Sequence, residues 1–280
     1  PVREPLAARA HRPVGKVPLS RVLRNKRPVK IVDIMDSDFY PVPVSMDQEE
    51  VAYVFRQYGI VSTPVTDDAG RLVGVVTVDD VVHVIDEEAE EDILKLAGVT
   101  ETSSIYSDVL QTTRARFIWL LVNLGTAVLA SFVIGLFGAT IEQQVALAIL
   151  MPIVASMGGN AGTQTLTVAV RALAMKDLSG AAASRFVSKE LLVGLLNGLL
   201  FAVITGAVAV FWFGDTLLGG VIAAAMVVNM LVAGLAGTLI PLGLERVGVD
   251  PAIASSVFLT TVTDVIGFFA FLGLAALILL

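Results

Sequence analysis

The sequence predicts a mainly α-helical membrane protein, with five transmembrane helices per subunit preceded by a small cytoplasmic α/β module and an acidic connecting helix. The first observation is composition: 55% of the 280 residues are hydrophobic and the mean hydropathy is +0.80, which is too apolar for a soluble chain of this size. The second is the distribution of charge, because 14 of the 19 Lys and Arg residues and 19 of the 26 Asp and Glu residues precede Phe117. Residues 1–116 are therefore expected to be soluble and residues 117–280 to form a transmembrane domain.

Five apolar stretches follow Arg116, and each reaches the roughly 20 residues that an α-helix needs to cross a bilayer. They are residues 117–138, 145–174, 186–213, 217–244 and 253–280. The second stretch contains Pro152, which removes a backbone donor, and the glycine-rich residues 158–162. We expect unwound backbone here, lining a wet cavity; a kink satisfied by neighbouring helices is the alternative.

Basic residues in the connections between these stretches predict the orientation. They gather before the first span, between the second and third, and between the fourth and fifth: Arg114, Arg116, Arg171, Lys176, Arg185, Lys189 and Arg246. The other two connections contain acidic residues and no Lys or Arg. The positive-inside rule then predicts that the chain lies in the plasma (inner) membrane of the cell with its soluble part in the cytoplasm and its C-terminus outside. Five spans agree with this orientation, because an odd number of crossings places the two ends on opposite sides.

One acidic residue, Asp264, lies inside the last apolar stretch among threonines, at residues 260–264. A charged side chain at the bilayer centre costs about 2.5–3.5 kcal/mol on the lenient insertion scale, so it normally faces a partner or a watery path. No Lys or Arg lies beside it in the sequence. The pattern therefore indicates a cation as its partner.

Residues 28–85 are predicted to form the α/β module. Ser45 and Gln48 resemble a capping box that opens a helix over residues 47–58, and strands are expected over residues 60–66 and 72–78. Thr77 and Asp80 mark the start of a further helix that continues to about residue 97.

That last helix is strongly acidic, and its acidic residues are followed by one base, Lys95. Like charges three or four residues apart repel, so the face is either simply solvated or screened by divalent cations, which prefer oxygen ligands. Residues 86–116 are assigned to this connecting helix and a linker. Residues 1–27 form a basic N-terminal segment, which either is solvated or contacts anionic lipid or the acidic helix. Nucleic acid is a less expected partner, because aromatic residues are not interleaved with the basic ones.

Several function classes find no support in the sequence. The chain has no cysteine and only two histidines, so thiolate metal sites and Cys nucleophiles are excluded. No Ser-His-Asp or phosphate-loop arrangement is present, and an enzyme is the least expected class.

The combination of motifs resembles the MgtE magnesium channels over residues 15–280. Residues 28–85, with the run from Gly70 to Asp80, resemble a cystathionine-β-synthase (CBS) module, and residues 86–97 resemble the acidic end of the family's "plug" helix. Residues 158–164 and 171–173 resemble the second-span signature, apart from Ala161 and Thr163, and residues 249–252 and 260–264 resemble the fifth span.

The resemblance implies a homodimer whose central pore is lined by the second and fifth spans. It implies that Asp264 of both subunits faces a largely hydrated Mg²⁺, with Asn160 and backbone carbonyls near Thr260 shaping the site. It also implies that cytoplasmic Mg²⁺ closes the pore by binding a set of acidic residues, which would repel one another without metal: Asp80, Glu88, Glu91, Asp92 and Asp250.

Two further expectations come from the same comparison. Family members usually carry an acidic helical N-terminal domain and two CBS modules; in this chain we expect no helical domain and only the tail of a first module, at residues 15–27. Gly74, Thr77 and Asp80 resemble the ribose-phosphate segment of nucleotide-binding CBS modules, which suggests ATP as a second ligand.

Three functions therefore stay open at this point. The favoured one is a channel that conducts Mg²⁺ into the cytoplasm and closes when cytoplasmic Mg²⁺ binds. The others are a secondary exchanger coupling Mg²⁺ to Na⁺ or H⁺, and a membrane-anchored metal or nucleotide sensor. The same oxygen ligands would serve Mg²⁺, Mn²⁺, Co²⁺ and Ca²⁺.

Overall fold

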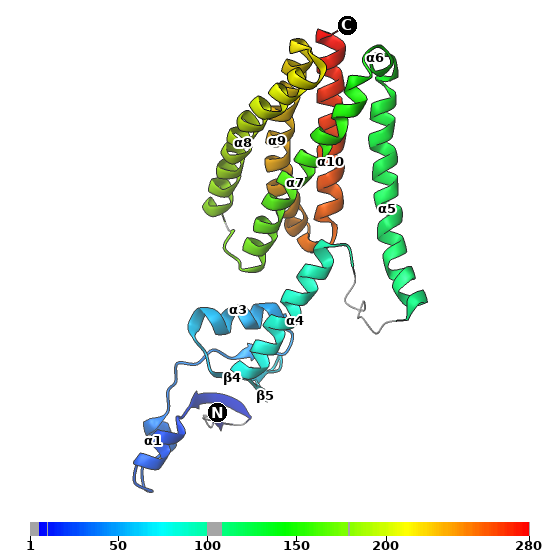
Figure 1. Cartoon of the computed structure of the whole chain (residues 1–280). Coiled ribbons are helices and arrows are strands. Elements are labelled where there is room, and N and C mark those ends of the chain that lie inside the picture. Colours follow the sequence, from blue (N-terminus) through cyan, green and yellow to red (C-terminus); the bar gives the residue numbers. More distant parts are fainter. Residues whose placement is uncertain (1–5, 10, 100–107, 179, 280) are drawn as a thin grey trace. The chain divides into compact units, whose positions relative to one another are not determined.

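The structure, a computed structural model, describes residues 6–9, 11–99, 108–178 and 180–279, apart from the side chains of residues 6–9, 254 and 255. The chain divides into two compact units, Pro1–Glu90 and Glu91–Leu280. Figure 1 traces the helices and strands of both.

The first unit contains two small sheets and four helices or parts of helices. An antiparallel hairpin, β1 (Leu6–Arg9) and β2 (Arg12–Lys16), is followed by two short helices, α1 (Leu19–Arg24) and α2 (Ile31–Ile34). The second sheet has the order β3-β4-β5, with β3 parallel and β5 antiparallel to β4. Its elements are β3 (Val42–Pro43), α3 (Gln48–Tyr58), β4 (Ser62–Thr66), β5 (Leu72–Thr77) and the first part of α4 (Val78–Leu96).

The core of this unit joins α3 to α4. Phe55 of α3 and Val81 of α4 are each 3% exposed and belong to one apolar cluster, against which Val76 of β5 packs. The predicted helix over residues 47–58 is confirmed, but its cap is not the one predicted. The carboxylate of Asp47, rather than Ser45, accepts the hydrogen bond from the Glu49 N–H, because Asp47 is the residue that stands at the N-cap.

The second unit is a bundle of long helices, preceded by the end of α4. Its elements are α5 (Val109–Gly135), α6 (Gly138–Gln143), α7 (Ala146–Ala174), α8 (Ala181–Phe213), α9 (Thr216–Arg246) and α10 (Pro251–Ile278). Among the described residues, five helices are long and apolar enough to cross a membrane: α5, α7, α8, α9 and α10. The predicted five spans are thereby confirmed, whereas the short α6 was not predicted.

The expectation of an unwound second span is wrong. Helix α7 runs without interruption from Ala146 to Ala174, with Pro152 inside it. Its glycines allow close packing instead: a Cβ on Gly158 would lie 2.2 Å from Asn229 Nδ2, and one on Gly162 would lie 2.7 Å from Leu259 Cδ1. The glycine-rich run therefore brings α7 close to α9 and α10.

Helix α9 is the centre of the bundle and packs against α7, α8 and α10 (Figure 1). In the most apolar 18-residue segment of α9, 56% of the residues are buried. The corresponding share in α5, which packs mainly against α10, is 11%. The α8–α9 contact depends on paired glycines. A Cβ on Gly194 would lie 2.8 Å from Met230 O, and one on Gly234 would lie 2.9 Å from Glu190 O.

We expect Gly234→Ala to destabilise the bundle by about 1–3 kcal/mol, because the added methyl group meets backbone that cannot rotate away. Gly243→Ala in the same helix is the matched control, since a Cβ there has no neighbour within 4 Å. It is expected to be neutral or stabilising, because Ala is the better helix former by roughly 0.5–1 kcal/mol. Thermal unfolding of the two purified variants in detergent measures the difference; equal midpoints would contradict the packing argument.

Candidate cation site

Helix α7 has a buried face and an exposed polar face. Gly158, Gly162 and Leu166 are buried in the bundle. On the opposite face a stripe of polar side chains is exposed at helical spacing, and we call it the α7 polar stripe: Ser156, Asn160, Thr163, Gln164 and Thr167. The predicted site residue Asn160 thus lies on this open face, where its Nδ2 donates to Ser156 Oγ at 3.4 Å.

Helix α10 packs beside α7 and holds the other predicted membrane residues. Asp264 is half-buried, and no hydrogen-bond or ion-pair partner for its carboxylate is found in the part of the chain that the structure describes. The Thr260 hydroxyl donates to Ser256 O and Val257 O, both at 3.1 Å, within its own helix. An unpaired carboxylate at membrane depth is costly, so the position of Asp264 calls for a partner that the described residues do not supply.

A second carboxylate, Glu190 of α8, is buried in the bundle and is only 8% exposed. Its Oε2 accepts a hydrogen bond from Thr165 Oγ1 of α7 at 3.0 Å. Lys189 Nζ lies 3.5 Å from its other oxygen. This acid differs from Asp264 because its charge has partners inside the chain, which indicates a structural role in joining α7 to α8.

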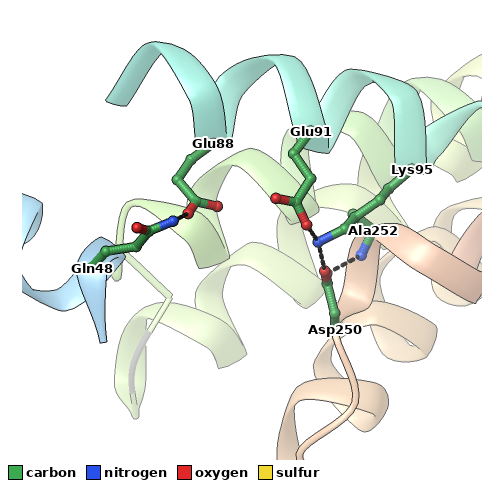
Figure 2. A network of polar contacts seen from close by, with 6 residues as sticks. All are labelled: Gln48, Glu88, Glu91, Lys95, Asp250 and Ala252. Carbon is green, nitrogen blue, oxygen red and sulfur yellow. Dashed lines mark hydrogen bonds and ion pairs between the residues drawn. The ribbon is translucent and has the colours of Figure 1, made fainter. Parts of the chain in front are cut away.

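The predicted regulatory acids are divided between the two units, with Asp80 and Glu88 in the first and Glu91, Asp92 and Asp250 in the second. In the first unit, Asp80 Oδ2 accepts hydrogen bonds from both the N–H and the hydroxyl of Thr77, at 3.0 and 2.8 Å. Glu88 Oε1 accepts one from Gln48 Nε2 at 2.6 Å (Figure 2). Both carboxylates are thereby held by neutral donors, and the predicted nucleotide residue Thr77 is engaged with Asp80.

In the second unit a lysine joins two of the predicted acids. Figure 2 shows Lys95 Nζ between the carboxylates of Glu91 and Asp250, with 2.7 Å to Asp250 Oδ2. The other oxygen of Asp250 caps α10 by accepting from the Ala252 N–H at 2.8 Å. Glu91, Lys95 and Asp250, which we call the Lys95 bridge, therefore tie the end of α4 to the start of the helix that carries Asp264.

The Lys95 bridge is partly shielded from water, since the three side chains are 19–34% exposed. Burial alone would lower the pKa of Lys95, but the hydrogen bonds and negative charges of Asp250 and Glu91 outweigh it and raise that pKa above its ordinary value. A raised pKa means that the ammonium is fully charged below about pH 10.4, the unperturbed value, and loses its proton only above the folded-state pKa. The positive charge of Lys95 therefore does not change with pH in the physiological range.

This arrangement corrects one expectation. Without metal, Glu91 and Asp250 were expected to repel each other, but Lys95 neutralises them. No group of three or more acidic or histidine side chains gathers in a metal-binding arrangement within the described residues. Asp92, half-buried beside Glu91 in the sequence, does not join such a group.

Sequence reasoning missed Lys95 and Asn229. Lys95 was noted only as the end of an acidic run, although a lone base at that place is itself a signal for an ion pair. Asn229 is the only Asn or Gln in the fourth apolar stretch, residues 217–244. An amide in the middle of a transmembrane helix calls for a hydrogen-bond partner, and this signal would have singled it out.

The fold and this site define a multi-pass membrane protein with an appended CBS domain, since residues 31–87 match the CBS domain family. Residues 151–274 match the MgtE family, described as divalent cation transporters. The chain belongs to the MgtE family. The domain boundaries at residues 27, 85 and 116 stay a prediction.

Two curated relatives are named magnesium transporter MgtE. The protein from Enterococcus faecalis is 36% identical over 264 residues, covering 94% of this chain and 58% of the relative. The protein from Thermus thermophilus is 38% identical over 252 residues, covering 89% and 56%. The chain thus spans about half the length of the curated relatives it matches. A solved cytosolic domain of the Mg²⁺ channel MgtE in complex with ATP is 36% identical over 28% of this chain and 32% of that chain, with a TM-score of 0.27.

Proposed function

We propose that this chain is one subunit of a homodimeric channel that conducts Mg²⁺ through the cell membrane into the cytoplasm and closes when cytoplasmic Mg²⁺ binds. Two observations carry the proposal: the exposed α7 polar stripe, and the half-buried Asp264 of the neighbouring helix α10, for whose carboxylate no partner is found among the described residues. The family and the names of its curated relatives support Mg²⁺ as the cargo.

The polar stripe calls for water or a second protein surface. The Thr163 and Thr167 hydroxyls donate within α7, to Gly159 O and Thr163 O at 2.8 Å. Hydrocarbon offers no hydrogen bonds, so each polar atom of the stripe that lacks a partner within α7 would be left unsatisfied in lipid, at a cost of several kcal/mol. The stripe runs over about three turns of α7, from Ser156 to Thr167. A second copy of the chain, with its own stripe facing the first, would enclose a water-filled path and remove this cost.

Mg²⁺ suits the groups that would line such a path. It gives up its water ligands reluctantly and is usually bound through one or two carboxylates while several waters remain. Two Asp264 carboxylates, one from each subunit, supply negative charge, and the amide of Asn160 and carbonyls near Thr260 offer neutral oxygen ligands. Rings of acidic side chains are a general device for cation selectivity.

Regulation is proposed to act through the Lys95 bridge. The bridge connects α4 to the N-cap of α10 without a metal ion. A divalent cation that binds Glu91 and Asp250 has to displace the lysine ammonium, so the two cations compete for the same oxygens. Asp80, Glu88 and Asp92 are the further predicted ligands. The cytoplasmic Mg²⁺ concentration would then set the fraction of channels in which α10 is held in the position that closes the pore.

ATP binding at the CBS domain remains a prediction. Its proposed contacts are Gly74, Thr77 and Asp80, and both hydrogen bonds from Thr77 go to Asp80 Oδ2. A ribose that uses this carboxylate would share it with Thr77.

The experiment that tests the function is Mg²⁺ flux into liposomes containing the purified protein, measured over a range of Mg²⁺ on the side of the soluble part. We expect flux down the Mg²⁺ gradient that does not require a Na⁺ or H⁺ gradient and that falls as Mg²⁺ on that side rises. Planar-bilayer recordings in Mg²⁺ solutions should show single-channel steps. A strict requirement for counter-transported Na⁺ or H⁺ would identify an exchanger, and absence of any flux would favour the sensor.

A further inference from the structure

One polar side chain is enclosed at the centre of the bundle, where α7, α9 and α10 meet. Asn229 of α9 is 0% exposed. Its Nδ2 donates to the backbone oxygen of Val154 on α7 at 2.7 Å. Its Oδ1 is buried and has no hydrogen-bond partner among the described residues.

Two glycines make the space for this amide. A Cβ on Gly158 of α7 would lie 2.2 Å from Asn229 Nδ2, and a Cβ on Gly267 of α10 would lie 3.0 Å from the same atom. Gly158 is two residues from Asn160, and Gly267 is one helical turn from Asp264. The amide is therefore wedged between the two helices that hold the candidate cation residues.

Stability alone does not explain an asparagine here. A buried polar atom without a partner costs roughly 1–3 kcal/mol, and α9 is the most buried of the five candidate spans. An apolar side chain of similar size would avoid that cost. Buried polar groups that lack a partner call for a specific reason, and a functional role is one of them.

We propose that Asn229 is a positioning residue of the cation path. Its amide sets the distance between α7 and α10, and through it the spacing of Asn160 and Asp264. This inference rests on the proposed Mg²⁺ transport and deepens it. A hydrated Mg²⁺ is recognised through its waters, so a change in the spacing of the two helices alters which hydrated cation the path fits.

The test compares Asn229→Ala, Gly158→Ala and the double variant in liposomes. Asn197→Ala, which removes an exposed amide of α8, is the matched control. Mg²⁺ flux per folded molecule, its half-saturating Mg²⁺ concentration and the ratio of Mg²⁺ to Ca²⁺ flux are measured for each. Folded protein is quantified by size-exclusion chromatography and thermal unfolding.

Gly158→Ala alone should lower the amount of folded protein, because the methyl group meets the amide at 2.2 Å. Asn229→Ala should fold but lose Mg²⁺ flux about tenfold or change the Mg²⁺ to Ca²⁺ ratio by a similar factor, which corresponds to about 1.4 kcal/mol. The double variant should recover folding, because the two changes compensate in volume, without recovering the wild-type flux ratio. If Asn229→Ala does not fold, the flux and the Mg²⁺ to Ca²⁺ flux ratio of the double variant test the positioning role instead.

A merely structural amide predicts a different result. Loss of folded protein with flux per folded molecule, half-saturation and flux ratio all within about twofold of the control would overturn the inference. If the wild type itself carries no Mg²⁺, the proposed function fails; if it carries Mg²⁺ and the Asn229 variants match it, only the positioning role fails.

Discussion

Replacing Asp264 with Ala is expected to lower Mg²⁺ flux to less than about a tenth of the wild-type value, because a loss of only ~1.4 kcal/mol in cation interaction changes an equilibrium constant tenfold. The carboxylate is half-buried within α10 and unpaired among the described residues. Among the described residues Glu190 has a hydrogen-bond partner and an ion-pair partner, and Asp264 has neither, so in the proposed path the charge of Asp264 would act on the permeating cation. In a dimer the substitution removes two such charges.

Asp264→Asn separates charge from shape, since the amide keeps the size and one oxygen. We expect it to fold at least as well as the wild type, because it removes a costly charge, and to conduct poorly. Glu142→Gln is the control, because it neutralises an exposed acid of α6. Mg²⁺ entry into liposomes is measured for all three variants, either with ²⁵Mg²⁺ or with a Mg²⁺-sensitive dye enclosed in the liposomes. A wild-type rate of Mg²⁺ entry for Asp264→Ala, at an equal amount of reconstituted protein, would refute the proposed path.

Replacing Lys95 with Met is expected to raise Mg²⁺ flux at the lowest cytoplasmic Mg²⁺ concentration, because closure without metal is weakened. The closure that remains is then expected to depend more strongly on cytoplasmic Mg²⁺. Without the ammonium, Glu91 and Asp250 repel each other and α4 loses its metal-free tie to α10. Partly exposed ion pairs contribute up to about 1 kcal/mol, so the ratio of open to closed channels should change by about fivefold. Lys95→Arg, which keeps the charge, is expected to stay close to the wild type.

Asp250→Asn gives an independent check of the same bridge. Asn is a good N-cap residue, so the hydrogen bond from the Ala252 N–H that begins α10 is kept while the charge is lost. Both Lys95→Met and Asp250→Asn should weaken closure at zero Mg²⁺, but only Asp250→Asn should also weaken closure by added Mg²⁺. Equal Mg²⁺ dependence of flux in both variants and the wild type would place the regulatory contact elsewhere.

The described residues bear out those features that follow from local pattern. The five spans were predictable because hydrophobic length alone decides whether a helix crosses a bilayer, and α3 and β5 were predictable from their periodicity and turn residues. The membrane acid Asp264 was predictable because a charge in an apolar stretch stands out without any structure. The N-cap at Asp47 was missed, since Ser45 offered an equally good motif two residues earlier.

The predictions that were wrong or incomplete concern contacts between helices. Gly158 and Gly162 indicated a broken helix, because glycine weakens an isolated helix. In the bundle they are the places where Asn229 and Leu259 approach α7, and packing outweighs the weak intrinsic preference. Nothing in the sequence pairs Lys95 with Asp250, since 155 residues separate them.

The amino-acid sequence by itself determined that five helices lie in the membrane and that an acid stands within the last of them, because both depend on the free energy of moving side chains out of water. The tertiary structure alone decided which face of α7 is exposed and which is buried, that Lys95 lies between the carboxylates of Glu91 and Asp250, and that Asn229 lies against Gly158 of α7 and Gly267 of α10. The first and third of these features depend on close approach of helices at glycines, and the second on a contact between residues far apart in the sequence. Both kinds of contact are properties of packed helices, not of any one segment.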